Sequence, residues 1–175
     1  MPRPPGYYGR VAERALITGI GGQDGSYLAE YLIGRGVEVL GIERPGSETA
    51  IHGVTMVEAD LSDASSVIGA VEAVRPDRIF HLAAASFVPD SWLHPTPTVS
   101  MAAVSTSAFL DAIVNVDRSI RFFQAASAEV FGRPTESPQN EATPIAPITP
   151  YGAGKALALF LTRMYRERFD LHAST

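Results

Sequence analysis

The chain has 175 residues, enough for one domain, and 46% of them are hydrophobic, so it can bury a sizeable core. Its formal net charge is −5 and it has no basic run, which argues against nucleic acid as a ligand and means that an anionic substrate needs a local basic pocket. It has no cysteine, which excludes disulfides and thiolate metal sites, so we expect a cytoplasmic protein without a bound metal.

The first residues show no targeting segment. Residues 1–10 lack the apolar core of a signal peptide, and no apolar run approaches the roughly 20 residues of a membrane span. We therefore expect a flexible tail over residues 1–12, one domain over residues 13–175, and no contact with a membrane.

Residues 15–28 form the most informative stretch, because a short apolar run gives way to three glycines at G-x-x-G-x-x-G spacing and then to a helical pattern. In such a unit Gly19 lets the chain turn, Gly22 lets the backbone approach a ligand, and Gly25 lets the helix pack on its strand. A pyrophosphate then binds the free amides at the helix N-terminus. The pattern predicts a dinucleotide-binding domain, and a purely structural glycine turn is the alternative.

The helix after this turn is predicted to end at Gly34 and to bury one face, formed by Tyr27, Leu28, Tyr31 and Leu32. A strand over residues 37–42 leads into Glu43 and Arg44, 18 residues past Gly25, where a dinucleotide fold reads the adenosine ribose. Glu43 would accept hydrogen bonds from the free 2′-hydroxyl of NAD, whereas Arg44 would pair with the 2′-phosphate of NADP. A solvated pair of loop charges is the third interpretation.

A third strand is predicted over residues 53–58, and Asp60 follows its carboxyl end, the edge where open α/β sheets bind ligands. Asp60 is therefore a candidate ligand contact or else an ordinary turn residue. Ser62 is predicted to cap the next helix, whose apolar positions stop before Pro76.

A fourth strand is predicted over residues 78–84, and the small residues from Ala83 to Ser86 leave room for a cofactor at its end. His81 lies inside this apolar run, so we expect a core histidine rather than a catalyst. The proline-rich residues 89–97 predict irregular structure. The helix expected over residues 99–116 is apolar almost all round, which indicates a subunit contact as well as a core face.

A fifth strand, over residues 120–126, is predicted to deliver Ser127 and Glu129 to the same sheet edge, before a long loop over residues 132–150. Strands and helices thus alternate along the chain, and residues 170–175 are expected to form a sixth strand. The pattern predicts an α/β fold, a doubly wound parallel sheet with helices on both faces.

The loop ends in a segment that carries chemistry. Thr149 can cap a helix with Pro150 in its first turn, which places Tyr151 and Lys155 one turn apart on one helical face. Lys155 is the only lysine in a chain with thirteen arginines. An ammonium beside a phenol stabilises the phenolate, which makes Tyr151 a usable acid or base. A chance Tyr/Lys pair on a surface helix is the alternative.

Four phrases are more specific than these spacings: GIGGQDGSYLAE at residues 19–30, ADLSD at 59–63, RFFQAASAEVFG at 121–132 and TPY at 149–151. On these phrases, residues 14–175 resemble the extended short-chain dehydrogenase/reductases, which have a Rossmann-type sheet, and within them the GDP-mannose 4,6-dehydratases. The Gln-Asp pair in the glycine turn is typical of that subgroup.

The resemblance implies a nucleotide-sugar dehydration that runs through an internal redox loop. Tyr151 would take the proton of the sugar 4-hydroxyl as hydride passes from C4 to the nicotinamide, Ser127 would hold that oxygen, and Lys155 would bind the nicotinamide ribose. Glu129 would then remove the C5 proton, water would leave from C6, and the hydride would return to C6. The implied cofactor contacts are Gly19, Gly22, Gln23, Asp24, Gly25, Arg44, Asp60, Leu61, Ala83, Tyr151 and Lys155, and the implied substrate contacts are Ser86, Ser127 and Glu129.

The chain departs from the family pattern at three positions and in length. Gly21 replaces a threonine of the turn, and Ala128 replaces a serine or aspartate, so any role of that side chain in protonating the leaving hydroxyl is lost or moved. The basic run after the second strand is reduced to residues 43–45, which leaves NADP expected from Arg44 and NAD as the alternative. Family members also continue well past residue 175, and their second half supplies most of the nucleotide-sugar pocket.

The resemblance therefore implies an NADP-dependent lyase that converts GDP-mannose to the 4-keto-6-deoxy sugar. One alternative is a nucleotide-sugar 4-epimerase or reductase, which shares the serine, tyrosine and lysine, and another is a non-catalytic NAD(P)-binding module. The expected partner is a second copy of the chain, in a homodimer or homotetramer that pairs the helix over residues 99–116 and the helix from Tyr151.

Overall fold

A computed structural model describes residues 12–47, 50–85 and 87–175, so the tail expected over residues 1–12 lies outside the described residues except for Ala12. The described chain forms one parallel sheet of six strands in the order β3-β2-β1-β4-β5-β6. The strands are β1 (Arg14–Thr18), β2 (Glu38–Glu43), β3 (Val54–Glu58), β4 (Arg78–His81), β5 (Arg121–Gln124) and β6 (Ala173–Ser174). The predicted doubly wound α/β fold is confirmed.

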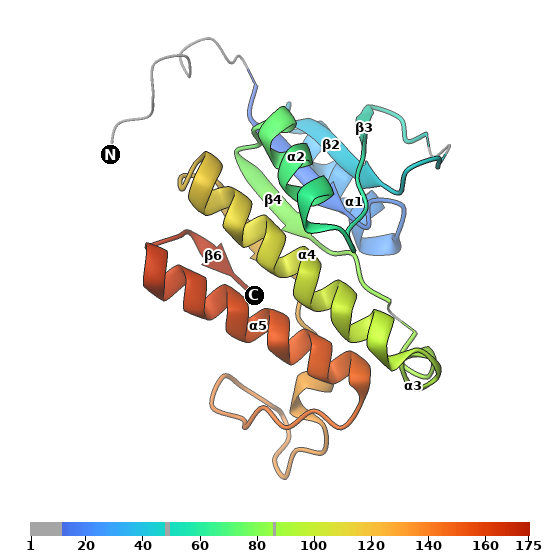
Figure 1. The fold of residues 1–175 in the computed structure, drawn as a ribbon, viewed down its shortest axis with the longest axis vertical. Helices are drawn as coiled ribbons and strands as arrows, with labels where there is room; N and C mark the ends of the chain where they lie inside the picture. Colours follow the sequence, from blue (N-terminus) through green and yellow to red (C-terminus); the bar gives the residue numbers. More distant parts are fainter. Residues whose placement is uncertain (1–11, 48–49, 86) are drawn as a thin grey trace.

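The helices cover both faces of the sheet, as predicted (Figure 1). They are α1 (Gln23–Ile33), α2 (Ala64–Val74), α3 (Asp90–Leu93), α4 (Pro95–Val116), the 3₁₀ turn η2 (Ala128–Phe131) and α5 (Pro150–Phe169). Successive side chains of a strand point to opposite faces. Accordingly, Ala15 and Ile17 of β1 pack with α1, whereas Leu16 joins the larger cluster under α2 and α4.

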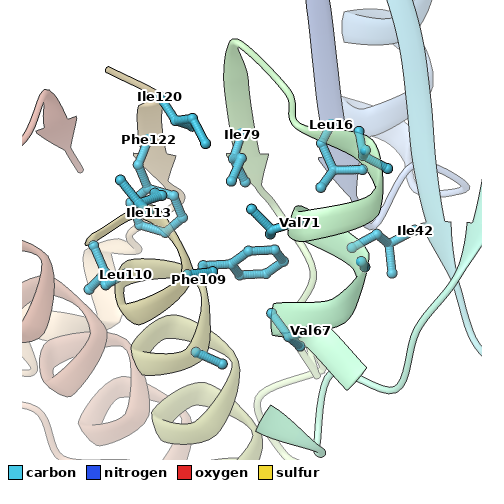
Figure 2. Close-up of a cluster of buried hydrophobic side chains, with 14 of the residues drawn as sticks. Leu16, Ile42, Val67, Val71, Ile79, Phe109, Leu110, Ile113, Ile120 and Phe122 are labelled. Carbon is cyan, nitrogen blue, oxygen red and sulfur yellow. The ribbon is translucent and has the colours of Figure 1, made fainter. Parts of the chain in front are cut away.

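The larger cluster holds the sheet and its helical layer together. Phe109 and Ile113 of α4 are fully buried against Ile79 of β4, Phe122 of β5 and Val71 of α2 (Figure 2). Burying side chains of this size contributes about 1.5–3 kcal/mol each relative to their exposure. The cluster holds β1, β4 and β5 against the helices through Leu16, Ile79 and Phe122, and the candidate site lies beyond the carboxyl ends of these strands.

The face predicted for α1 is wrong in part. Leu28 and Leu32 pack toward the sheet, but Tyr27 and Tyr31 are 65% and 54% exposed. The buried face of the helix is instead formed by Gly25, Ala29 and Leu32, and the small residues Gly25 and Ala29 let the backbone come close to the strand. Arg35 covers the ring of Tyr31 at 3.5 Å, which accounts for a tyrosine at the surface.

The cap of α2 also differs from the prediction. Asp63, not Ser62, is the N-cap: its carboxylate accepts hydrogen bonds from the Ser65 amide at 2.9 Å and the Ser65 hydroxyl at 2.7 Å. Ser62 instead donates its hydroxyl to Asp60 Oδ1 at 2.6 Å. Aspartate and serine cap helices about equally well, so the local turn decides which residue does so.

The irregular structure predicted over residues 89–97 is wrong, because these residues contain α3 and the start of α4. Pro95 and Pro97 lie in the first turn of α4. Backbone amides in a first turn have no acceptor within the helix, so a proline there costs the helix no hydrogen bond.

Helix α4 also corrects the expectation that no segment approaches a membrane span. Among the described residues it is long and apolar enough to cross a membrane, with a mean hydropathy of 1.5. Helix α4 packs against α2 on one side and α5 on the other (Figure 1). This packing buries 39% of its most apolar stretch, and the subunit contact expected along this helix stays a prediction.

Candidate active site

The glycine turn lies at the point where the strand order reverses, between β1 and its neighbour β4. Gly19 has a φ of +68°, and a Cβ on it would lie 2.9 Å from the Ala83 amide nitrogen. A Cβ on Gly25 would collide with the Gly19 carbonyl oxygen and lie 2.7 Å from Ile20 Cα. Both positions therefore need glycine, and the crevice beside them is the usual ligand site of an open α/β sheet.

The N-terminus of α1 opens onto this crevice. Gly22 is its N-cap and, within the described residues, no side chain caps the first turn. Gln23 and Asp24 are exposed, and the Gly22 amide donates to the Gly19 carbonyl at 3.0 Å. Uncapped amides at a helix N-terminus bind anions, so this turn fits a diphosphate.

The ends of β2 and β3 hold the candidate adenosine contacts. Asp60 Oδ1 accepts from the Ser62 hydroxyl and from the Ser62 amide at 2.8 Å. These two bonds, with a smaller contribution from the charge of Arg44, hold the pKa of Asp60 below its usual value. The Asp60 side chain therefore stabilises a turn, and its predicted contact with the cofactor stays a prediction. Leu61 beside it is partly buried.

Glu43 and Arg44 differ in their environments. Arg44 is exposed, whereas Glu43 is partly buried and its Oε2 is shielded from solvent with no hydrogen-bond partner in the described part of the chain. Ser86, the serine expected near the sugar, is outside the described residues.

A pocket opens at the carboxyl ends of β4 and β5, against α4 and α5. It is lined by His81, Ala83, Ala84, Ala85, Thr98, Met101, Ala102, Thr106, Gln124, Tyr151, Lys155 and Ala158. The small side chains after β4 leave the pocket open, as expected from the run of alanines. Tyr151 and Lys155 are its two lining residues with the acid–base chemistry that the sequence singled out.

Lys155 is only 5% exposed. Its Nζ donates to the Ala125 carbonyl at 2.8 Å and lies 5.9 Å from the centroid of the Tyr151 ring. Burial lowers the pKa of Lys155, because it disfavours the charged form. Lys155 thus lies one helical turn after Tyr151, with its nitrogen near the tyrosine ring. The hydrogen bond to the Ala125 carbonyl, just after β5, fixes the position of that nitrogen.

Ser127 and Glu129 are not among the lining residues of the pocket but stand beside it on η2, which packs against α5. Ser127 caps η2, since its Oγ accepts from the Glu129 amide at 3.2 Å. A Cβ on Gly152 would lie 2.6 Å from the Glu129 carbonyl oxygen, so η2 and α5 touch through backbone. The structure therefore places Glu129 beside Thr149 and Gly152, at the start of the helix that carries Tyr151 and Lys155, whereas Arg44 and Asp60 follow β2 and β3 farther along the sheet edge.

Sequence reasoning missed two features of this site. It did not find η2, and it treated Thr149 only as a helix cap. Thr149 Oγ1 does cap α5, accepting from the Gly152 amide at 3.0 Å, but it also donates to Glu129 Oε2 at 3.3 Å. The serine two residues before Glu129 was the available signal for η2; nothing local marks the contact with Thr149, which is 20 residues away.

His81 is a core residue, as predicted, with 2% of its surface exposed. Its burial, and secondarily the charge of Lys155, lower the pKa of His81 to about 3, so the imidazole is neutral at physiological pH.

Comparison with known proteins gives the family of this chain. The model of a family described as GDP-mannose 4,6 dehydratase matches residues 16–175. The chain belongs to the GDP-mannose 4,6-dehydratase family.

Members of the GDP-mannose 4,6-dehydratase family from distant organisms are similar to the chain. The Vibrio cholerae enzyme is 35% identical over 93% of this chain and 48% of its own length. The human enzyme is 36% identical over 96% of this chain and 50% of its own length. The chain spans about half the length of these curated relatives.

The fold is shared with solved epimerases. A putative epimerase from Burkholderia cenocepacia superimposes with a TM-score of 0.81 at 30% identity, covering 93% of this chain and 53% of its own. The UDP-glucose 4-epimerase of Thermus thermophilus in complex with NAD gives a TM-score of 0.81 at 26% identity, covering 90% of this chain and 52% of its own. These similarities confirm the Rossmann-type architecture.

Proposed function

We propose that residues 13–175 form the dinucleotide-binding domain of a nucleotide-sugar 4,6-dehydratase, a lyase that converts GDP-mannose to the 4-keto-6-deoxy sugar. Family membership supports the substrate class. The observation that carries the reaction type is the placement of Glu129 on a turn packed against the helix of Tyr151 and Lys155. A carboxylate at that place supplies a second base, which can take the C5 proton of the sugar while Tyr151 takes the hydroxyl proton.

Each of the four residues has a role that its environment suits. Tyr151 takes the proton of the sugar 4-hydroxyl, and Ser127 holds the same oxygen by a hydrogen bond. Lys155, fixed on the Ala125 carbonyl, stabilises the phenolate and binds the nicotinamide ribose. Glu129 removes the C5 proton once C4 is a ketone, because the ketone acidifies that position.

The crevice fits a nicotinamide dinucleotide. Gly22 and the uncapped first turn of α1 would hold the diphosphate, and Ala83 would lie beside the nicotinamide half. Similar solved structures are epimerases in complex with NAD, which supports a nicotinamide cofactor here. When bound, the nicotinamide supplies a hydride acceptor for C4 and a hydride donor for C6.

We propose NADP as the cofactor, held at its 2′-phosphate by Arg44, with NAD as the second candidate through Glu43. Replacing Arg44 with alanine should weaken NADP binding about tenfold, since a charge-assisted hydrogen bond is worth about 1.5–3 kcal/mol and this one is exposed. NAD binding should not change. Fluorescence titration of both dinucleotides measures the difference. If Arg44→Ala leaves the affinity for NADP unchanged and Glu43→Gln weakens the binding of NAD, the protein prefers NAD to NADP.

Replacing Glu129 with glutamine separates a dehydratase from an epimerase or reductase of the same family. The variant should lose about 10²–10⁴-fold in product formation, the usual contribution of a general base. It should retain oxidation at C4, which needs only Tyr151, Ser127 and Lys155. The readout is exchange of the C5 proton with deuterated water, with the exposed Glu141→Gln as the matched control. A Glu129→Gln variant that keeps its activity would favour the epimerase or reductase. A wild-type protein that binds dinucleotide without any hydride exchange would favour a non-catalytic module.

We further propose a cytoplasmic protein that pairs with a second copy of itself, as a homodimer or homotetramer. Phe160 and Met164 of α5 are 45% and 58% exposed and offer an apolar contact on that helix. Light scattering that finds only monomers would contradict the proposed pairing of two copies.

A further inference from the structure

A buried chain of hydrogen bonds runs beneath the glycine turn and involves none of the four proposed catalytic residues. Thr18 of β1, His81 of β4 and Ser105 of α4 are 0%, 2% and 2% exposed. Thr18 Oγ1 lies 2.7 Å from His81 Nδ1, and His81 Nε2 lies 2.9 Å from Ser105 Oγ. Three elements far apart in sequence are thus joined through one imidazole ring.

The donors and acceptors of this chain can be assigned by counting. Thr18 Oγ1 accepts the Leu82 amide at 3.1 Å and the Ala83 amide at 3.0 Å, which uses both of its lone pairs. Its proton must therefore go to His81 Nδ1. The ring proton is then on Nε2 and is donated to Ser105 Oγ, which in turn donates to the Met101 carbonyl at 2.7 Å. Only a neutral imidazole in this tautomer completes the chain.

The chain of bonds fixes backbone at the candidate cofactor crevice. Leu82 and Ala83 follow β4 directly, and the Ala83 amide nitrogen would be the nearest atom, at 2.9 Å, to a Cβ built on Gly19. The backbone after β4 therefore packs closely against the glycine turn at the end of β1. Phe109 packs on the imidazole, with ring centroids 5.0 Å apart, and keeps the ring in this orientation.

We propose that His81 is a positioning residue of the dinucleotide crevice: it orients the Thr18 hydroxyl so that this group clamps the Leu82 and Ala83 amides beside the glycine turn. The inference rests on the proposed function for its ligand, but the clamp itself exists without one. A histidine serves here because its ring accepts at one end, from Thr18 of β1, and donates at the other, to Ser105 of α4.

Two substitutions separate the two ends of the ring. In His81→Asn the amide oxygen reaches as far as Nδ1 does, so it can still accept from Thr18 but cannot reach Ser105. In His81→Gln the amide reaches as far as Nε2 does, so it can meet Ser105 and leaves the Thr18 hydroxyl without an acceptor. Both variants lose core packing, and Ile113→Val supplies a control for destabilisation that leaves the clamp intact.

Amide hydrogen exchange at Leu82 and Ala83 is the first readout, because it needs no nucleotide. We expect exchange at both amides to be faster by about tenfold or more in His81→Gln, and near wild type in His81→Asn and Ile113→Val. The Phe122 amide, which bonds to the His172 carbonyl in the same sheet, should be unaffected. Equal exchange in the Asn and Gln variants would overturn the inference.

Dinucleotide titration of the same variants is the second readout. The dissociation constant should rise about tenfold in His81→Gln and stay near the wild-type value in His81→Asn. Unchanged affinity in His81→Gln would overturn the inference, since His81 would then be only a core residue. A wild-type chain that binds neither NAD nor NADP would instead contradict the proposed function, and the exchange rates alone would then decide whether the clamp exists.

Discussion

Replacing Tyr151 with phenylalanine is expected to reduce turnover of GDP-mannose by about 10²–10⁴-fold, the range for loss of a general acid or base. In the proposed mechanism the Tyr151 phenol takes the C4 hydroxyl proton, and the ring stays in place without the oxygen. Binding of the dinucleotide should therefore change little. Steady-state kinetics on the longest natural form of the protein, with a dinucleotide titration beside it, separates the two effects.

Tyr165 provides a matched control on the same helix. Its hydroxyl donates to Asp111 Oδ1 at 2.6 Å, a bond that raises the pKa of Tyr165 to about 12 and keeps the phenol protonated. Tyr165→Phe should lower stability by about 1 kcal/mol and leave turnover unchanged. If Tyr151→Phe and Tyr165→Phe behaved alike, Tyr151 would not be the acid–base group.

The second large effect is expected at Gly25. Alanine there should weaken dinucleotide binding at least about 100-fold, because the added carbon meets the Gly19 carbonyl oxygen and pushes α1 away from the turn proposed to hold the diphosphate. Titration of NAD and NADP, together with the melting temperature, measures binding and folding separately.

Two neighbouring glycines control for this change. A Cβ on Gly21 would have no atom within 4 Å among the described residues, so Gly21→Ala should bind as the wild type does. A Cβ on Gly22 would approach only the Gly19 oxygen, at 3.2 Å, and Gly22→Ala should have an intermediate effect even if Gly25→Ala fails to fold. Wild-type affinity in a folded Gly25→Ala variant would mean that the turn does not hold the ligand.

The fold could be predicted because its signals are local. The glycine spacing around Gly19 marks the β1–α1 turn, and apolar runs mark the other strands. The errors have local causes as well: Tyr27 and Tyr31 have the spacing of a buried face but lie outside it, and prolines in the first turn of α4 look like loop residues.

The candidate site could be predicted only in part. Tyr151 and Lys155 are one helical turn apart, so their proximity follows from sequence. The contacts of Thr149 with Glu129 and of Lys155 with Ala125 depend on how η2 and the end of β5 pack against α5. The clamp of Thr18 and His81 joins residues 63 apart, and no local pattern reveals it.

The proposed mechanism requires that one site oxidises C4 and reduces C6 of the same sugar. GDP-mannose deuterated at C4 tests this directly, with the longest natural form of the protein and the product analysed by mass spectrometry and NMR. We expect a 4-keto-6-deoxy product that carries the deuterium at C6. Product without deuterium at C6, or deuterium retained at C4 of an epimerised sugar, would contradict the mechanism.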